Sequence, residues 1–293
     1  MYISIKNRLI FLLIAFTLLP FVLLRIVAYP RIQSDLQDVL IRNLDGIGHK
    51  QTELVTNWTH ERMKNVRVVA NNPLMSKCAK IKKEDKDYSD IVQYLEVLKN
   101  EYGFKGALVS NDKGIVTIAT ADEGVATDIS EADYFKQAIQ GNTFVSSIIP
   151  SEIPLVNELG EKEIGVPTMF VSTPLKDRDG VIIGVVSLRI DVNALNELML
   201  SLKLGKTGET YLVNKDGVMI TESRFTKDAV LRQKVDTEPV RLFQTQKKIM
   251  TGIYPDYRGI PVLGASMGDD MEEEGFGLGW TILAEIDEAE AFA

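Results

Sequence analysis

The chain has 293 residues, of which 45% are hydrophobic and 25% are charged, and its formal net charge is −8. The length leaves room for two modest domains. The acidic balance argues against a nucleic acid partner, because no basic stripe is available to contact phosphates. The single cysteine, Cys78, excludes an intrachain disulfide and a multi-cysteine metal site.

The chain begins with an apolar run from Leu9 to Tyr29 that is long enough to cross a bilayer. Lys6 and Arg8 precede it, which favours a cytoplasmic N-terminus. The run is longer than the hydrophobic segment of a typical signal peptide, and no small-residue cleavage site follows it. We therefore expect residues 1–29 to form a cytoplasmic tip and a single transmembrane helix in the cell (inner) membrane. The rest of the chain is then expected in the periplasm or outside the cell.

A mostly polar helical pattern occupies residues 30–73 and predicts a long stalk helix. Gly46 and Gly48 weaken the pattern midway, and Pro73 ends it. The apolar residues of this pattern could pack against a domain core, against a dimer partner or against both, because the two kinds of contact require the same spacing. Its apolar positions follow one another at gaps of three, four and seven residues: Leu36, Leu40, Leu44, Ile47, Leu54 and Trp58.

After residue 73 the sequence pattern changes, and residues 74–203 are predicted to form a first module of helices and strands. We expect one or two helices in residues 74–102 and then two hairpins with glycine-containing polar turns. The hairpins are expected over 106–120 and 166–190, a helix over 131–140, a strand over 143–149, a polar loop over 150–165 and a closing helix over 191–202.

A similar pattern repeats in residues 204–293 and predicts a second module. The segment LVNKDG at 212–217 echoes LVSNDKG at 108–114. The predicted fold class is therefore α+β, with two tandem modules that contain antiparallel sheets. In the second module a hairpin is expected over 210–223, a helix over 228–245 and strands over 249–254, 260–267 and 280–286.

Several short motifs carry a resemblance to a known family. In the second module they are GKTGETYLVNKDG at 205–217, DYRG at 256–259, PVL at 261–263 and GWTILAEID at 279–287. In the first they are DYF at 133–135 and GVVSLRID at 184–191. With these motifs the chain resembles the double Cache (dCache) family, which comprises extracytoplasmic sensor domains of bacterial transmembrane receptors.

The resemblance implies an architecture and a function. Both modules should be PAS-like, and the chain should be a ligand-sensing domain of a receptor, most similar to those of sensor histidine kinases. A second membrane helix and an output domain are then expected beyond Ala293. The alternative is the ectodomain of a chemoreceptor. A different class of protein, a membrane-anchored extracytoplasmic enzyme or binding protein, is a further alternative. We expect a homodimer in the full-length receptor.

The chain offers no catalytic constellation and implies no cofactor. Neither His49 nor His60 is near a candidate serine, and Cys78 has no base partner in the sequence around it. On one helix the two histidines would lie about 16 Å apart, too far to share a metal. The acidic run at 269–274 fits no calcium loop and is expected to be a solvated turn, with divalent cation binding as the alternative.

The resemblance also implies where a ligand binds. In amino-acid-binding members, an arginine two residues before the aromatic pair of the first module holds the ligand carboxylate, and strand acids hold its ammonium group. Here these positions fall on Ala132, Ser146 and Arg189. We therefore expect a small organic anion rather than an α-amino acid. The expected ligand-binding residues are Tyr134, Phe144, Ser146, Phe170, Ser172, Arg189 and Asp191.

Each candidate also has a purely structural interpretation. Tyr134 and Phe135 could be core aromatics, and Ser146 and Ser172 could cap backbone groups. Arg189 could pair with Asp191, two residues along the same strand, instead of facing a ligand.

Overall fold

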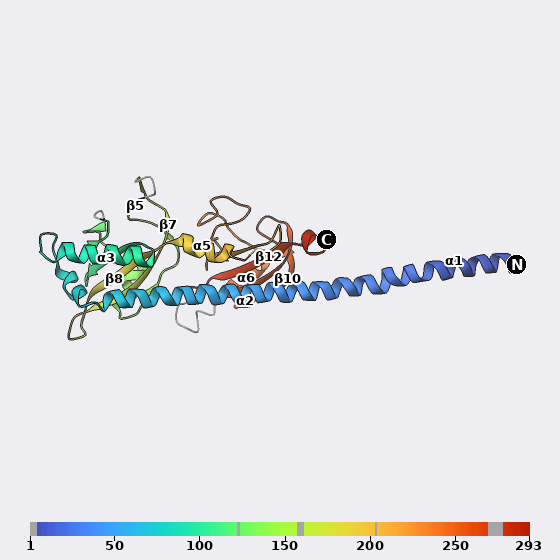
Figure 1. Ribbon diagram of the computed structural model, residues 1–293, viewed down its shortest axis with the longest axis horizontal. Coiled ribbons are helices and arrows are strands. Elements are labelled where there is room, and N and C mark those ends of the chain that lie inside the picture. The colour runs from blue at the N-terminus through green and yellow to red at the C-terminus, as the bar shows by residue number, and fades with distance from the viewer. Residues whose placement is uncertain (1–4, 122–123, 157–160, 203, 269–277) are drawn as a thin grey trace.

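The computed structural model of the chain describes residues 5–121, 124–156, 161–202, 204–268 and 278–293. One long helix runs the length of the molecule, and two antiparallel sheets lie one after the other along its C-terminal half (Figure 1). The acidic run at 269–274 lies outside the described residues.

The long helix is continuous but changes type along its length. It consists of α1 (Ile5–Leu23), a π-helical turn (Leu24–Ala28) and α2 (Tyr29–Ala70). Its N-terminal part is apolar and long enough to cross a membrane by length and composition, and none of the described side chains in that apolar window is buried. The helix ends where the sequence predicts, because Asn71 caps α2 and the Asn72 side chain accepts a hydrogen bond from the backbone N–H of Leu74.

Gly46 and Gly48 do not interrupt α2, contrary to the weakening expected from the sequence. A Cβ atom at Gly48 would lie 2.7 Å from Cγ of Met267, which belongs to the second sheet. The missing side chain therefore lets the helix approach that sheet closely, and this packing offsets the low helix propensity of glycine.

The first sheet has the strand order β2-β1-β8-β7-β3, and all its described pairs are antiparallel. Helices α2 and α3 (Tyr88–Tyr102) cover one face, and α4 (Asp133–Ile139) covers the other. A 3-10 helix (Pro73–Lys80) joins α2 to α3. The strands are β1 (Phe104–Asn111), β2 (Val116–Ala119), β3 (Phe144–Val145), β7 (Pro167–Lys176) and β8 (Ile182–Ile190), and β4 (Ile149–Pro150) also pairs with β7.

Both predicted hairpins of the first sheet are present, but the strand expected over 143–149 is split into β3 and β4. The break occurs at Ser146, whose hydroxyl oxygen accepts the backbone N–H of Phe170 at 2.8 Å. A side-chain acceptor thus takes the place of a backbone carbonyl and ends the ladder. The loop expected over 150–165 contains a short pair of strands, β5 (Leu155–Val156) and β6 (Lys162–Glu163).

The second sheet has the order β10-β11-β12-β9 and follows α5 (Val192–Leu200). Its strands are β9 (Glu209–Val213), β10 (Thr251–Pro255), β11 (Pro261–Gly268) and β12 (Thr281–Asp287). Helix α6 (Glu238–Gln246) contacts β11, and the chain ends in α7 (Glu288–Ala291).

Two expectations for the second sheet are wrong. Residues 218–223 make only isolated bridges, and the helix expected over 228–245 begins only at Glu238. Asp228 and Leu231 have positive φ angles of 54° and 61°, which no α-helix accommodates. The backbone of this stretch instead bonds back to residues 217–219: Leu231 N–H donates to the Met219 carbonyl and Val235 N–H donates to the Gly217 carbonyl.

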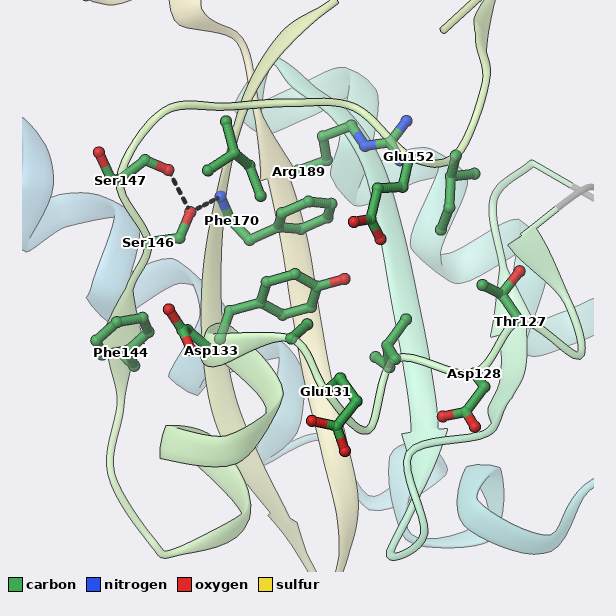
Figure 2. A pocket seen from close by; sticks show the side chains of 15 residues that line it. Thr127, Asp128, Glu131, Asp133, Phe144, Ser146, Ser147, Glu152, Phe170 and Arg189 are labelled. Atoms are coloured by element: carbon green, nitrogen blue, oxygen red, sulfur yellow. Dashed lines mark hydrogen bonds between the residues drawn. The ribbon is translucent and has the colours of Figure 1, made fainter. Parts of the chain in front are cut away.

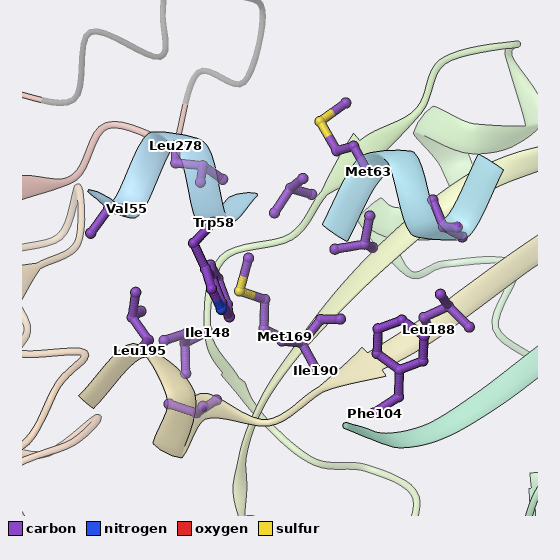
Figure 3. Close-up of a cluster of buried hydrophobic side chains, with 14 of the residues drawn as sticks. Val55, Trp58, Met63, Phe104, Ile148, Met169, Leu188, Ile190, Leu195 and Leu278 are labelled. Atoms are coloured by element: carbon purple, nitrogen blue, oxygen red, sulfur yellow. The ribbon is translucent and has the colours of Figure 1, made fainter. Parts of the chain in front are cut away.

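The hydrophobic core is continuous from one sheet to the other because α2 contributes to both. Trp58 of α2 is only 8% exposed and points toward Met169 of the first sheet and Leu195 of α5 (Figure 3). Farther along α2, Val66 and Val69 are fully buried against the first sheet. Helix α2 therefore binds the two sheets into one hydrophobic unit.

Two carboxylates are buried opposite each other in the second sheet. Glu209 of β9 and Glu285 of β12 are cross-strand partners and are 5% and 1% exposed. Tyr211 donates a hydrogen bond to Glu285 at 2.9 Å, and Tyr257 donates one to Glu209 at 2.6 Å. The nearby cation, Arg258, pairs instead with two aspartates, Asp256 and Asp287. Burial raises the pKa of Glu285 to about 8, so this carboxyl group is protonated at neutral pH.

We expect this buried acid to make stability depend on pH. The folded-state pKa of about 8 lies above the usual value of 4.5, so the folded chain keeps a proton that the unfolded chain releases between these values. The free energy of unfolding should therefore fall as pH rises through this window, by at most roughly 1.4 kcal/mol per pH unit from this group. Glu285→Gln should flatten the dependence, measured by denaturant titration of the solubilised chain across the window. Exposed Glu84→Gln is the control, and equal slopes in the wild type and Glu285→Gln would contradict the expectation.

Candidate functional site

A cavity of about 260 Å³ lies on the face of the first sheet that carries α4 (Figure 2). The loop that follows β3 passes over it, and the end of β8 forms its floor. Five of the seven side chains expected to bind a ligand line this cavity: Tyr134, Phe144, Ser146, Phe170 and Arg189. The structure thus brings together residues that are up to 55 positions apart in the chain (189 minus 134).

Two stacked aromatic rings form one wall of the cavity. Tyr134 lies in the first turn of α4 and Phe170 lies in β7, and their ring centroids are 4.3 Å apart with an interplanar angle of 21°. The sequence places Phe135 beside Tyr134, but Phe135 packs into the core between α4 and the sheet. Of the two aromatic residues of the DYF motif, Tyr134 therefore lines the cavity and Phe135 packs in the core.

Arg189 is a buried cation without an ion pair in the described part of the chain. Its residue is 5% exposed, its guanidinium carbon lies 5.3 Å from the Phe170 ring centroid, and its Nε has no hydrogen-bond partner. Burial lowers the pKa of Arg189, but a guanidinium group still remains charged at neutral pH. A buried charge of this kind is unfavourable until an anion joins it.

Asp191 does not supply that anion. Its carboxylate accepts a hydrogen bond from the Asn193 backbone at the start of α5 and pairs with Lys105 at 3.0 Å. The pairing of Arg189 with Asp191, which the sequence left open, is therefore absent, and the guanidinium faces the cavity.

The two serines have partners within the protein. The Ser146 hydroxyl donates to the Ser147 carbonyl at 2.8 Å while it accepts from Phe170, so its lone proton is already used. Ser172 is fully buried within the sheet, where it bonds Ser187 at 2.8 Å. Ser172 and Asp191 are not among the described residues that line the cavity.

Four carboxylates at the cavity were not foreseen as site residues: Asp128, Glu131, Asp133 and Glu152. All four are exposed and lie around the mouth, whereas Arg189 is buried. The pKa of Tyr134 is raised to about 12, chiefly by burial and also by the charge of Glu152, while Arg189 opposes the rise, so the Tyr134 hydroxyl lies within the fields of both charges. Asp133 begins the DYF motif and Glu131 lies two residues before it, so both were visible in the sequence, but only the folded loop brings Glu152 to the same cavity.

The described residues contain no group of three or more histidine, cysteine or acidic side chains that could hold a metal ion. The four carboxylates therefore form a diffuse negative rim around the cavity, and the site combines this rim, an aromatic wall and a cationic floor. Such an arrangement can bind and orient a small ligand that carries a negative group at its inner end.

Comparison with solved structures supports the fold. The ligand-binding domain of the Pseudomonas aeruginosa PAO1 amino acid chemoreceptor PctB, in complex with L-Arg, is 18% identical, with a TM-score of 0.60 over 89% of this chain and 98% of that chain. The sensory domain of the Campylobacter jejuni chemoreceptor Tlp3 (CcmL) is 16% identical, with a TM-score of 0.62 over 90% of this chain and 100% of that chain. The extracellular domain of the putative histidine kinase rpHK1S-Z16 is 15% identical, with a TM-score of 0.60 over 86% and 96%. At these identities the likeness concerns the fold alone.

Two sequence comparisons complete the assignment. A search of curated proteins found no match. The family model described as Cache domain, in its double Cache (dCache) form, matches residues 32–293, which is nearly the whole of the chain that follows the apolar segment. This match covers more than half of the chain, and the fold is that of the similar sensory domains. The chain therefore belongs to the Cache domain family.

Proposed function

We propose that the chain is the extracytoplasmic ligand-sensing part of a transmembrane signal-transduction receptor, with residues 1–29 as tip and membrane helix and 30–73 as stalk. Residues 74–203 then form a membrane-distal PAS-like module and 204–293 a membrane-proximal one. The exposed apolar window at the N-terminus and the unbroken helix from it to the first sheet support this layout. The output is a histidine kinase or, as the alternative, a chemoreceptor.

The observation that carries the ligand assignment is the buried guanidinium of Arg189, which has no ion pair among the residues that the structure describes. A carboxylate that entered the cavity would supply acceptors for the buried guanidinium of Arg189, whose Nε has no partner among the described residues. Tyr134 and Phe170 would pack on the carbon skeleton of the same molecule. A small organic anion therefore fits the cavity, whose volume of about 260 Å³ is close to the lower end of known ligand pockets.

A zwitterion is the second candidate, because the rim carries the four carboxylates named above. An ammonium group at the mouth would meet these acids while a carboxylate reached Arg189. The similar structures named above include one in complex with L-Arg, and another similar structure, of Tlp3, has isoleucine bound. Because the rim acids are solvent-exposed, their attraction for an ammonium group is weak compared with that of a buried charge.

Arg189→Ala is expected to weaken the binding of small carboxylates by about one to two orders of magnitude, since a charge-assisted hydrogen bond contributes roughly 1.5–3 kcal/mol. The measurement is thermal shift followed by calorimetric titration of the solubilised chain, against organic acids and amino acids. Exposed Arg178→Ala, on the turn between β7 and β8, is the matched control. Carboxylate binding that survives Arg189→Ala unchanged would place the ligand elsewhere, and stronger stabilisation by neutral amino acids would favour the zwitterion.

The proposed topology is tested in cells. Protease added to spheroplasts that express the chain should digest the region beyond residue 30, because that region faces outward. The same protease should leave an N-terminal epitope placed before Met1 intact. Protection of the sheet-bearing region from protease would contradict the topology.

We also propose that the receptor is a homodimer through the part of α2 that lies outside both sheets. There Ile32, Leu36 and Val39 follow at intervals of four and three and are 64%, 43% and 45% exposed. Leu36→Cys in membranes should therefore form a disulfide-linked dimer on mild oxidation, whereas Asp38→Cys on the opposite side should not. The native Cys78 provides a silent background, since burial raises its pKa to about 12. Equal crosslinking at both positions would argue against this interface.

A further inference from the structure

The two buried carboxylates of the second sheet belong to a hydrogen-bonded network on the face away from α2. Glu209 accepts three hydrogen bonds, and its donors come from two segments that are distant from β9 and from each other along the chain. The donors are the Tyr257 hydroxyl at 2.6 Å, the Ser223 hydroxyl at 3.2 Å and the Arg224 backbone N–H at 3.0 Å. Because Glu209 is buried, the loop at 221–226 that supplies two of these donors closes over it.

Glu285, the cross-strand partner of Glu209, has fewer donors. One of its oxygens accepts the Tyr211 hydroxyl at 2.9 Å, and Oε1 is buried without a hydrogen-bond partner among the described residues. An ionised carboxylate with an unsatisfied oxygen is unfavourable in a buried position, whereas a protonated carboxyl group carries no charge that needs solvation. Of the two carboxyl groups, Glu285 is therefore the one that holds a proton, and Glu209 is the one that its donors stabilise as an anion.

The charges around the pair do not favour a second anion. The negative charges of Glu209 and Asp256 both disfavour ionisation of Glu285. Of the two cations, Arg224 donates to backbone carbonyls just before β9, and Arg258 is paired with two aspartates. The titratable and charged side chains that face the pair in the described structure are Tyr211 of β9, Tyr254 of β10, Asp256, Tyr257 and Arg258 of the turn after β10, Arg224 of the loop and Asp287 of β12. The segment before α6 and α6 itself contribute apolar side chains to this face: Met219, Ala229, Val235 and Val240.

Tyr257 connects the proton-bearing group to the loop. Its hydroxyl lies 2.6 Å from the Ser223 hydroxyl in addition to its bond with Glu209. Its ring meets the Tyr211 ring edge-on, with centroids 5.5 Å apart, and Tyr211 is the donor to Glu285. A change at Glu285 therefore reaches the loop through two packed tyrosines as well as through the charge of Glu209.

We propose that Glu209 and Glu285 form a proton-responsive pair that controls whether the loop at 221–226 stays closed over the second sheet. With a proton on Glu285, the pair carries one negative charge, and the donors of Glu209 hold the loop in place. Loss of that proton puts a second buried negative charge beside the first, and water reaches it only when the loop moves away. The device does not depend on Arg189 or on a ligand. Only the statement that it responds to pH outside the cytoplasm rests on the proposed topology.

Proton linkage fixes the direction of the effect. The closed form keeps its proton up to a pH near the pKa of Glu285, which burial raises to about 8. In an open form, water solvates the carboxyl group, which then releases its proton near the usual pKa of 4.5. Opening should therefore become more frequent as pH rises between these two values, by at most about tenfold per pH unit, and should level off above the higher one.

Hydrogen exchange of the solubilised full chain measures this opening, after correction for the intrinsic pH dependence of amide exchange. In the loop, the amides of Arg224, Phe225 and Thr226 bond Glu209 or Ser223 and report its closure. Between about pH 5.5 and pH 8 their corrected exchange should accelerate by at least about tenfold. The internal reference is the turn between β7 and β8, where the amides of Asp179 and Val181 bond Asp177. Its exchange should not accelerate.

Two variants identify the group that titrates. Glu285→Gln is neutral at every pH and should remove the acceleration in the loop. Glu238→Gln, an exposed acid at the start of α6, is the matched control and should retain it. Loop exchange in the wild type that is independent of pH overturns the proposal, and so does equal acceleration in the reference turn. Acceleration that persists in Glu285→Gln also overturns it. The wild-type comparison of loop and reference turn decides by itself if Glu285→Gln does not fold.

Discussion

The burial of one face of α2 against both sheets is the contact on which the rest of the structure depends. Without it, two sheets of modest size would each expose an apolar face, because α3 contacts chiefly β1 and β2 on that side of the first sheet and α6 packs with Tyr211 and Leu283 in a separate cluster of the second. Trp58, Val55 and Met63 lie between the sheets and belong to the same cluster as residues from each. At roughly 25 cal/mol per Å² of apolar surface removed from water, such a face outweighs any single polar contact in the chain.

The same helix also buries polar side chains that hydrophobic spacing does not mark. Gln51 is fully buried and donates to the Met199 carbonyl at the end of α5, at 3.2 Å. Thr59 bonds back to the carbonyl of Val55 within the helix. The helix thus satisfies a carbonyl of the segment that links the sheets, in addition to its apolar contacts. The fixed position of α5 then sets where β9, and with it the second sheet, begins.

The two sheets differ in what they place on the face away from α2. On the first, Arg189 borders a cavity beside a stacked aromatic pair. On the second, the side chains of Tyr211, Glu285 and Tyr254 fill the comparable face, and Gly264 leaves just enough room for the Tyr254 hydroxyl. On the first sheet, the buried charge of Arg189 therefore borders an open cavity. The other accommodates its buried carboxyls with hydroxyl donors and a raised pKa.

The sequence by itself determined the local elements, because their causes are local. Proline after two asparagines ends α2, and polar turns with glycine at positive φ, such as Gly114 and Gly180 at 82°, close the two hairpins of the first sheet. The family motifs located Tyr134, one of the two aromatic residues of the cavity wall.

Only the tertiary structure decided the partners of side chains for which the sequence allowed several partners. The helix expected over 228–245 lost its first half to backbone bonds with residues 217–219, which are distant from most of it along the chain. Likewise, the spacing allowed Asp191 to pair with Arg189. The Asp191 carboxylate instead accepts a hydrogen bond from the backbone at the start of α5 and pairs with Lys105, so the Arg189 guanidinium faces the cavity. Such choices depend on which groups a fold brings within a few ångströms, and spacing along one strand does not contain that information.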